Sequence, residues 1–179
     1  MNPIEELKSR LLDNYAELWQ EKTLKRNEFL KVQGSRDANM YYVEEGTVRA
    51  YIETEYEEQT IRFGYKGSFI GALDSFLTGR PSPFYLQAIK KSQLKVITRT
   101  NFLKFVQADT TNLQLYCTML EMWAIQQMER EMDILTYSPR ERYERVFKRS
   151  PHLFQEIPAK YIASYLRMSP ETLSRLKKS

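Results

Sequence analysis

Residues 40–52 read MYYVEEGTVRAYI and decide the fold class of this chain. Two runs rich in β-branched and aromatic residues, 40–43 and 47–52, flank the turn signal Glu45-Gly46, a pattern typical of successive strands. Further runs of this kind lie at 60–63, 84–89 and 94–97, and we expect the last two to form a strand pair. Since no helix long enough to cross over separates these runs, they predict antiparallel sheets closed into a roll or sandwich.

Helical periodicity marks the segments around this β unit. Residues 3–20 repeat apolar side chains at helical spacing, namely Ile4, Leu7, Leu11, Tyr15 and Leu18. Asn2 can cap this helix and Pro3 suits its first position. Residues 71–83 read as a short helical turn and a loop, 101–107 as a short helix, and 140–148 as a helix with Tyr143, Val146 and Phe147 inward.

The longest predicted helix, 111–136, has no Gly or Pro. Its apolar residues form two sets with spacings of three and four: Leu113, Cys117, Leu120 and Ala124, then Ile125, Met128, Met132 and Leu135. The register slips between the sets, so we expect one half to pack on its own domain and the other on a partner. The alternative is packing within one chain, although ~39 Å of helix, at ~1.5 Å per residue, exceeds what a small roll covers. The predicted dimer interface is Leu120, Ile125, Met128, Met132 and Leu135.

Composition narrows the class of protein. The 179 residues are 42 % hydrophobic and 28 % charged, which suits one large or two small folded domains. The chain has no apolar run of the ~20 residues that a membrane helix needs, and its single Cys117 fits a reducing compartment, so a soluble cytoplasmic protein is expected. Cys117 and His152 are interpreted as structural, and no glycine-rich phosphate loop is present. Nothing indicates an enzyme, a metal site or a cofactor.

Charge is distributed unevenly along the chain. Residues 138–179 hold ten Lys/Arg and four Asp/Glu, a net of +6, whereas residues 1–137 have a net of −2. Such a basic end indicates contact with a polyanion. A solvated helical surface is the alternative that charge alone leaves open.

The last residues, 159–179, have the spacing of a helix-turn-helix. Ile162, Ala163 and Leu166 face one way, Met168 lies in the turn, and Leu173 and Leu176 face back from a second helix that Ser169 caps and Pro170 begins. The outward residues suit DNA bases and phosphates, and the predicted DNA-binding set is Ser169, Glu171, Thr172, Arg175, Lys177 and Lys178. An ordinary helical hairpin is the alternative. The turn residue Arg167 stands where a positive φ is often needed, at a cost of about 1 kcal/mol for a residue other than Gly.

Three blocks carry a family resemblance: Tyr42-Val43-Glu44-Glu45-Gly46 with Val48-Arg49; Phe69-Ile70-Gly71 with Phe76-Leu77-Thr78-Gly79; and Tyr143-Glu144, Ile157-Pro158, Tyr161-Ile162-Ala163-Ser164-Tyr165-Leu166 and Ser169-Pro170-Glu171-Thr172-Leu173-Ser174-Arg175. Over essentially the whole chain they resemble the cyclic AMP receptor protein/FNR (Crp/Fnr) family of bacterial transcription regulators, most closely its short Bacteroidetes-type members. The resemblance implies an α+β fold: a cupin-like, cyclic-nucleotide-binding-like β-roll sensor (1–110), a dimerisation helix (111–137) and a helix-turn-helix domain (138–179).

The chain departs from the family pattern at the ligand site. Cyclic-nucleotide-binding members have Gly-Glu-Leu and Arg-Ser/Thr-Ala, whereas this chain has Gly71-Ala72-Leu73 and Pro81-Ser82-Pro83, so a carboxylate and a phosphate partner are missing. The ligand-pocket candidates are Gly71, Ala72, Leu73, Arg80 and Ser82, with Arg80 as a substitute cation. The cysteines of iron–sulfur members are absent, and no β-hairpin wing follows the second helix in this chain.

The favoured hypothesis is a homodimeric, sequence-specific transcription regulator that does not respond to cyclic AMP. Its expected partners are double-stranded DNA, a second copy of the chain, RNA polymerase and an unknown small-molecule effector. No membrane contact is expected. The alternative is a β-roll module that senses a ligand or a protein without binding specific DNA. A cupin-type enzyme is a third hypothesis, weakened by the lack of the histidine pair that such metal sites need.

Overall fold

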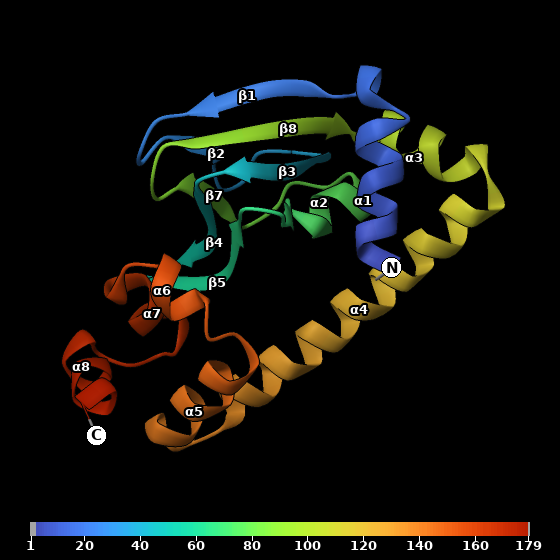
Figure 1. Ribbon diagram of the computed structural model, residues 1–179. Coiled ribbons are helices and arrows are strands. Elements are labelled where there is room, and N and C mark those ends of the chain that lie inside the picture. Colours follow the sequence, from blue (N-terminus) through green and yellow to red (C-terminus); the bar gives the residue numbers. More distant parts are fainter. Residues whose placement is uncertain (1–2, 179) are drawn as a thin grey trace.

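Two antiparallel four-stranded sheets face each other in the computed structural model, which describes residues 3–178 (Figure 1). One sheet has the order β1 (Gln20–Leu24), β8 (Ser92–Thr98), β3 (Asn39–Glu45) and β6 (Phe69–Ile70). The other has the order β2 (Phe29–Lys31), β7 (Tyr85–Ala88), β4 (Thr47–Glu53) and β5 (Glu58–Tyr65). The predicted antiparallel sandwich is confirmed, and its interior is filled from both sheets, by Val43 and Leu94 on one side and Val48 and Leu86 on the other.

The chain changes sheets at Gly46, between β3 and β4. Gly46 has φ +93°, and a Cβ there would lie 2.4 Å from the carbonyl oxygen of Lys91 and 2.3 Å from Oγ of Ser92. A glycine is therefore required because two sheet-changing corners, 46 and 89–91, lie directly against each other.

The predicted pairing of 84–89 with 94–97 is wrong. β7 pairs with β2 and β4, whereas β8 pairs with β1 and β3, so the two strands belong to different sheets. β1, β2 and β6 were not predicted from the sequence. β1 is an edge strand whose first four residues are exposed, so it shows no apolar alternation.

The predicted helix over 3–20 is too long. α1 spans Pro3–Asp13, a short 3₁₀ turn, η1, follows at Ala16–Leu18, and β1 begins at Gln20. The chain folds back here because the indole Nε1 of Trp19 donates to the carbonyl oxygen of Leu11 at 2.9 Å. The expected cap, Asn2, lies outside the described residues.

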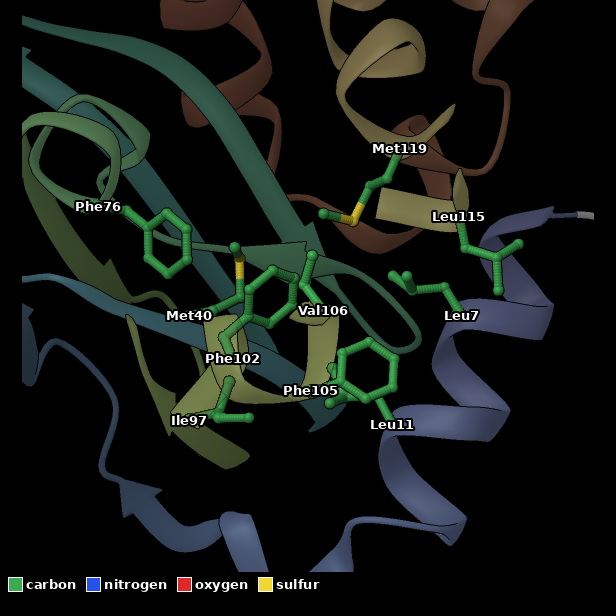
Figure 2. Packing of buried hydrophobic residues seen from close by; sticks show 10 residues of the cluster. All are labelled: Leu7, Leu11, Met40, Phe76, Ile97, Phe102, Phe105, Val106, Leu115 and Met119. Carbon is green, nitrogen blue, oxygen red and sulfur yellow. The ribbon is translucent and has the colours of Figure 1, made fainter. Parts of the chain in front are cut away.

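Helices close one end of the sandwich around a second core (Figure 2). α1, α2 (Leu73–Thr78), α3 (Arg99–Ala108) and α4 (Thr110–Leu135) bring side chains into it. The buried members are Leu7, Leu11, Met40, Phe76, Ile97, Phe102, Phe105, Val106, Leu115 and Met119. The short helical turn predicted within 71–83 is confirmed by α2, and the helices predicted at 101–107 and 111–136 are confirmed by α3 and α4 within two residues at each end.

α4 does not use its apolar residues as predicted. Its first half packs on the core through Leu115 and Met119, whereas Leu113 and Cys117 of the first predicted set are exposed. Both predicted sets lie on the side of α4 that faces away from the rest of the protein, where Met128 is 65 % and Leu135 70 % exposed. The exposed apolar face is thus one stripe along the whole helix. Within residues 3–178 no helix is long and apolar enough to cross a membrane.

The C-terminal unit consists of α5 (Pro139–Arg149), α6 (Leu153–Glu156), α7 (Ala159–Tyr165) and α8 (Pro170–Lys178), and it lies beside β5 (Figure 1). Its own core, with Val146, Leu153, Ile162 and Leu173, continues into Phe63 of the sheet. Phe147, predicted to point inward, is 45 % exposed, while its neighbour Val146 is buried.

Candidate nucleic-acid interface

A tight left-handed turn joins α7 to α8. Arg167 has φ +52°, and the amide of Met168 donates to the carbonyl oxygen of Ala163 at 3.1 Å, five residues back. This bonding closes the C-terminus of α7 in the manner usually reserved for glycine. The positive φ expected at Arg167 is confirmed.

Arg142 of α5 holds this turn from outside. Its guanidinium donates to the carbonyl oxygens of Leu166 at 2.9 Å and Arg167 at 3.1 Å, and also to those of Thr136 at 2.6 Å and Tyr137 at 3.0 Å. One side chain therefore binds the orphan carbonyls at the ends of both α4 and α7. Sequence reasoning missed Arg142, because nothing local distinguishes it from the other arginines of its helix.

α8 buries one side and exposes the other. Leu173 is completely buried and Leu176 half-buried, as predicted, and Oγ of Ser169 accepts from the amide of Thr172 at 3.2 Å, as a cap should. The hydrogen bonds of Glu171 at this helix start lower the pKa of its carboxyl, which is therefore ionised at neutral pH. The exposed side carries Glu171, Ser174, Arg175 and Lys178.

Two of the predicted DNA-binding residues stand apart from that face. Thr172 is half-buried, with its hydroxyl 3.1 Å from that of Ser169, and Lys177 leans toward the ring of Phe154, with Nζ 5.9 Å from the centroid. Ser174, which sequence reasoning did not select, shares the face of Glu171 and Lys178. Helical spacing could have identified it, since 171, 174, 175 and 178 fall on one side.

Part of the basic character of residues 138–179 is used inside the molecule. Arg145 and Arg149 both pair with the fully buried carboxylate of Asp133 in α4, Arg145 at 3.2 Å, and both reach Glu129, at 3.3 and 3.1 Å. With Arg142, three of the ten cations of this segment therefore serve to attach α5 to α4 and to the turn. The charge available to a polyanion is concentrated on α8 and around Lys160 and Arg167, which are exposed.

α7 is attached to the edge of the β4–β5 sheet by polar contacts. Oγ of Ser164 accepts from the amide of Thr60 at 2.9 Å and donates to the carbonyl oxygen of Glu58 at 2.7 Å. Arg49, almost fully buried, pairs with Glu58 and lies against the ring of Tyr161, 4.5 Å from its centroid. These contacts satisfy groups that an edge strand leaves open, and they fix the orientation of α7 relative to the sandwich.

Two of the five ligand-pocket candidates line one small cavity. Gly71 and Leu73 line a cavity of only about 20 Å³, roughly the size of one water. Ala72 is buried, and Arg80 is exposed. Ser82 is buried, with its carbonyl oxygen accepting from Nζ of Lys31 at 3.2 Å.

Lys31 was missed by sequence reasoning. Its side chain is almost fully buried, and its ammonium also donates to the carbonyl oxygens of Val32 at 2.9 Å and Phe84 at 3.0 Å. Burial lowers the pKa of Lys31, while Asp37 and Asp74 act in the opposite direction. The loop around Ser82 is therefore anchored by a cation of the chain itself.

Comparison with known proteins agrees with this architecture. Residues 21–109 match the family model of the cyclic nucleotide-binding domain. FixK2 from Bradyrhizobium japonicum has a TM-score of 0.74 at 17 % identity, over 89 % of this chain and 83 % of that one. The catabolite activator protein of Thermus thermophilus has a TM-score of 0.62 at 19 % identity, over 99 % and 85 %. A CooA mutant from Carboxydothermus hydrogenoformans has a TM-score of 0.69 at 16 % identity, over 99 % and 83 %.

No curated protein sequence matches the chain. Residues 21–109 therefore resemble a cyclic nucleotide-binding domain, and the fold of the chain, including the C-terminal helices, is similar to the folds of FixK2, the catabolite activator protein and CooA.

Proposed function

We propose that the chain is a homodimeric, sequence-specific transcription regulator of the Crp/Fnr type, a short member of that family, and no enzyme. The carrying observation is the exposed polar face of α8 beside a turn that Arg142 fixes in place. A rigidly held helix with polar and basic groups outward is what reading of the major groove requires. RNA polymerase and a small-molecule effector are proposed as further partners.

α4 supports the dimer. Its exposed apolar stripe has spacings of three and four residues over the whole helix and includes Leu120, which is half-buried, and the exposed Ile125, Met128, Met132 and Leu135. A stripe of this length on a two-fold axis would bury the same residues of both copies. Two copies of α8 would then meet half-sites about one helical turn apart.

The contacts proposed on DNA fall into two classes. Arg175 can pair its fork with guanine O6 and N7, and the ionised Glu171 can accept from cytosine N4. We assign Lys178 on the exposed face, and Lys177, Thr172 and the cap Ser169 beside it, to phosphate contacts, which set position and affinity but not sequence.

The experiment is selection of binding sites from randomised half-sites, followed by titration at several salt concentrations. Arg175→Ala should cost about 1–3 kcal/mol on the selected site and relax the preference at one base pair. Lys178→Ala, its neighbour on the same face, should weaken all sequences alike and reduce the salt slope by about one unit. An unchanged preference with Arg175→Ala would favour the alternative, a sensing module without specific DNA binding.

The domain is not expected to respond to cyclic AMP. The cavity at Gly71 and Leu73 holds about 20 Å³, and neither a carboxylate at position 72 nor a guanidinium within residues 81–83 is present.

A further inference from the structure

A cleft of about 380 Å³ lies where three parts of the molecule meet. β5 and the turn toward β6 form one wall, the middle of α4 a second, and α5 with the start of α6 a third. The volume is within the range of small-molecule sites, ~300–1,000 Å³. The cleft contains none of the ligand-pocket candidates selected from the sequence.

Three guanidinium groups line this cleft, those of Arg62, Arg130 and Arg149, and its lining includes no Asp or Glu. Arg149 is neutralised by its ion pairs with Glu129 and Asp133. Among the described residues, neither Arg62 nor Arg130 has an ion pair with a carboxylate. The carboxylate next to Arg130 along the helix, Asp133, already serves Arg145 and Arg149. Two guanidinium groups of the cleft therefore make no direct ion pair with a carboxylate of the described residues.

Arg130 is the more deeply placed of the two, with 7 % of its surface exposed. It donates to the carbonyl oxygens of Tyr165 at 2.6 Å and Thr60 at 3.3 Å, and its guanidinium stacks 3.7 Å from the centroid of the Tyr165 ring. Its Nε is buried and has no hydrogen-bond partner. A buried cation with an open donor is costly unless an anion compensates it.

Arg62 faces the same cleft from β5. Among the described groups, its guanidinium donates one hydrogen bond, to the exposed amide oxygen of Gln127 at 3.3 Å. Burial lowers the pKa of both Arg62 and Arg130, while Tyr165 acts in the opposite direction on both and Asp133 does so on Arg130 without forming an ion pair with it.

The rest of the lining combines aliphatic and small polar residues with several aromatic rings, those of Phe63, Tyr65, Phe69, Trp123 and Tyr165. Flat rings favour stacking with a flat apolar partner. We propose that this cleft binds a small organic anion that has a phosphate, sulfonate or carboxylate group on a flat apolar body. The charged group would lie between Arg62 and Arg130, and the body against the aromatic rings.

Such a ligand would contact the sandwich, the long helix and the C-terminal unit at once. It would therefore couple the β-sandwich to the orientation of α8, and this effector role rests on the proposed function. The binding site itself does not, because its test involves no DNA.

The test is fluorescence titration of the full chain with two dyes. 1-Anilinonaphthalene-8-sulfonate has a sulfonate on a flat apolar body, and N-phenyl-1-naphthylamine is the same body without the charge. Arg62→Gln should weaken binding of the sulfonate dye about tenfold, because one charged hydrogen bond is lost, and should leave the neutral dye within twofold. Arg26→Gln, a change of the same kind at an exposed arginine far from the cleft in sequence, should affect neither dye.

Arg130→Met should give the larger loss for the sulfonate dye. Arg130 also donates hydrogen bonds to the carbonyl oxygens of Thr60 and Tyr165, so its replacement can disturb the fold. The result for Arg130→Met is therefore used only if the circular dichroism and the melting temperature of the variant match those of the parent. If they do not match, Arg62→Gln alone tests the proposal. The proposal is overturned if the sulfonate dye does not bind, if Arg62→Gln leaves its affinity unchanged, or if both dyes lose affinity equally. If the parent chain binds the sulfonate dye but no specific DNA, the proposed function is refuted and the assignment of the cleft as an anion site still stands.

Discussion

Replacing Arg142 by Met should remove the hydrogen bonds that hold the turn between α7 and α8 and so destabilise the protein. The arginine makes four hydrogen bonds to carbonyl oxygens, of which those to Leu166 and Thr136 are partly buried and those to Tyr137 and Arg167 exposed. Water can replace Arg142 at the exposed pair, so their loss costs little. Each partly buried bond to this charged donor is worth about 1.5 kcal/mol, so the free energy of unfolding should fall by about 3 kcal/mol.

The assay is urea unfolding at a fixed protein concentration, since a dimer makes apparent stability depend on concentration. Lys148→Met, on the same helix at an exposed position, is the control and should stay within about 0.5 kcal/mol of the parent. Arg142→Lys keeps the charge, but a lysine cannot bind the carbonyl oxygens at both helix ends. Its loss in free energy of unfolding should therefore lie between those of Arg142→Met and Lys148→Met. If Arg142→Met is as stable as Lys148→Met, the turn is held by the apolar contacts of α7 and α8 alone and the argument fails.

Three further results are expected. Met128→Glu should place an unpaired charge in the proposed dimer seam and give monomers by light scattering at tens of micromolar, whereas a monomeric parent would refute the seam. Calorimetry with cyclic AMP should show no micromolar binding; such binding would mean that the small cavity near Gly71 opens to admit a nucleotide. Gly46→Ala should destabilise by about 3 kcal/mol, because left-handed strain adds to overlap with Lys91, while Gly34→Ala, also at positive φ but with open space for a Cβ, should cost only about 1 kcal/mol. Equal losses at the two glycines, measured by urea unfolding, would mean that the corner at Gly46 can relax.

The sequence by itself determined the features that depend on neighbours within one or two turns of chain. The two runs of β-branched and aromatic residues in 40–52, with the turn signal between them, identified strands of the sandwich. The cap Ser169 and Pro170 located α8, and the turn before Met168 predicted a positive φ at Arg167. Each of these properties depends on residues that are close together in the sequence, so local patterns are enough to predict them.

Only the tertiary structure decided which distant residues become partners. Arg142 meets Leu166 across 24 positions, Lys31 meets Ser82 across 51, and Arg130 meets Thr60 across 70. An arginine that holds a turn and an exposed one look alike in sequence, because the difference lies in which carbonyls the fold brings within reach of the guanidinium. The partners of β7 and β8, the side of α4 that stays exposed and the arginine-lined cleft were decided in the same way, since each depends on how separately formed elements pack.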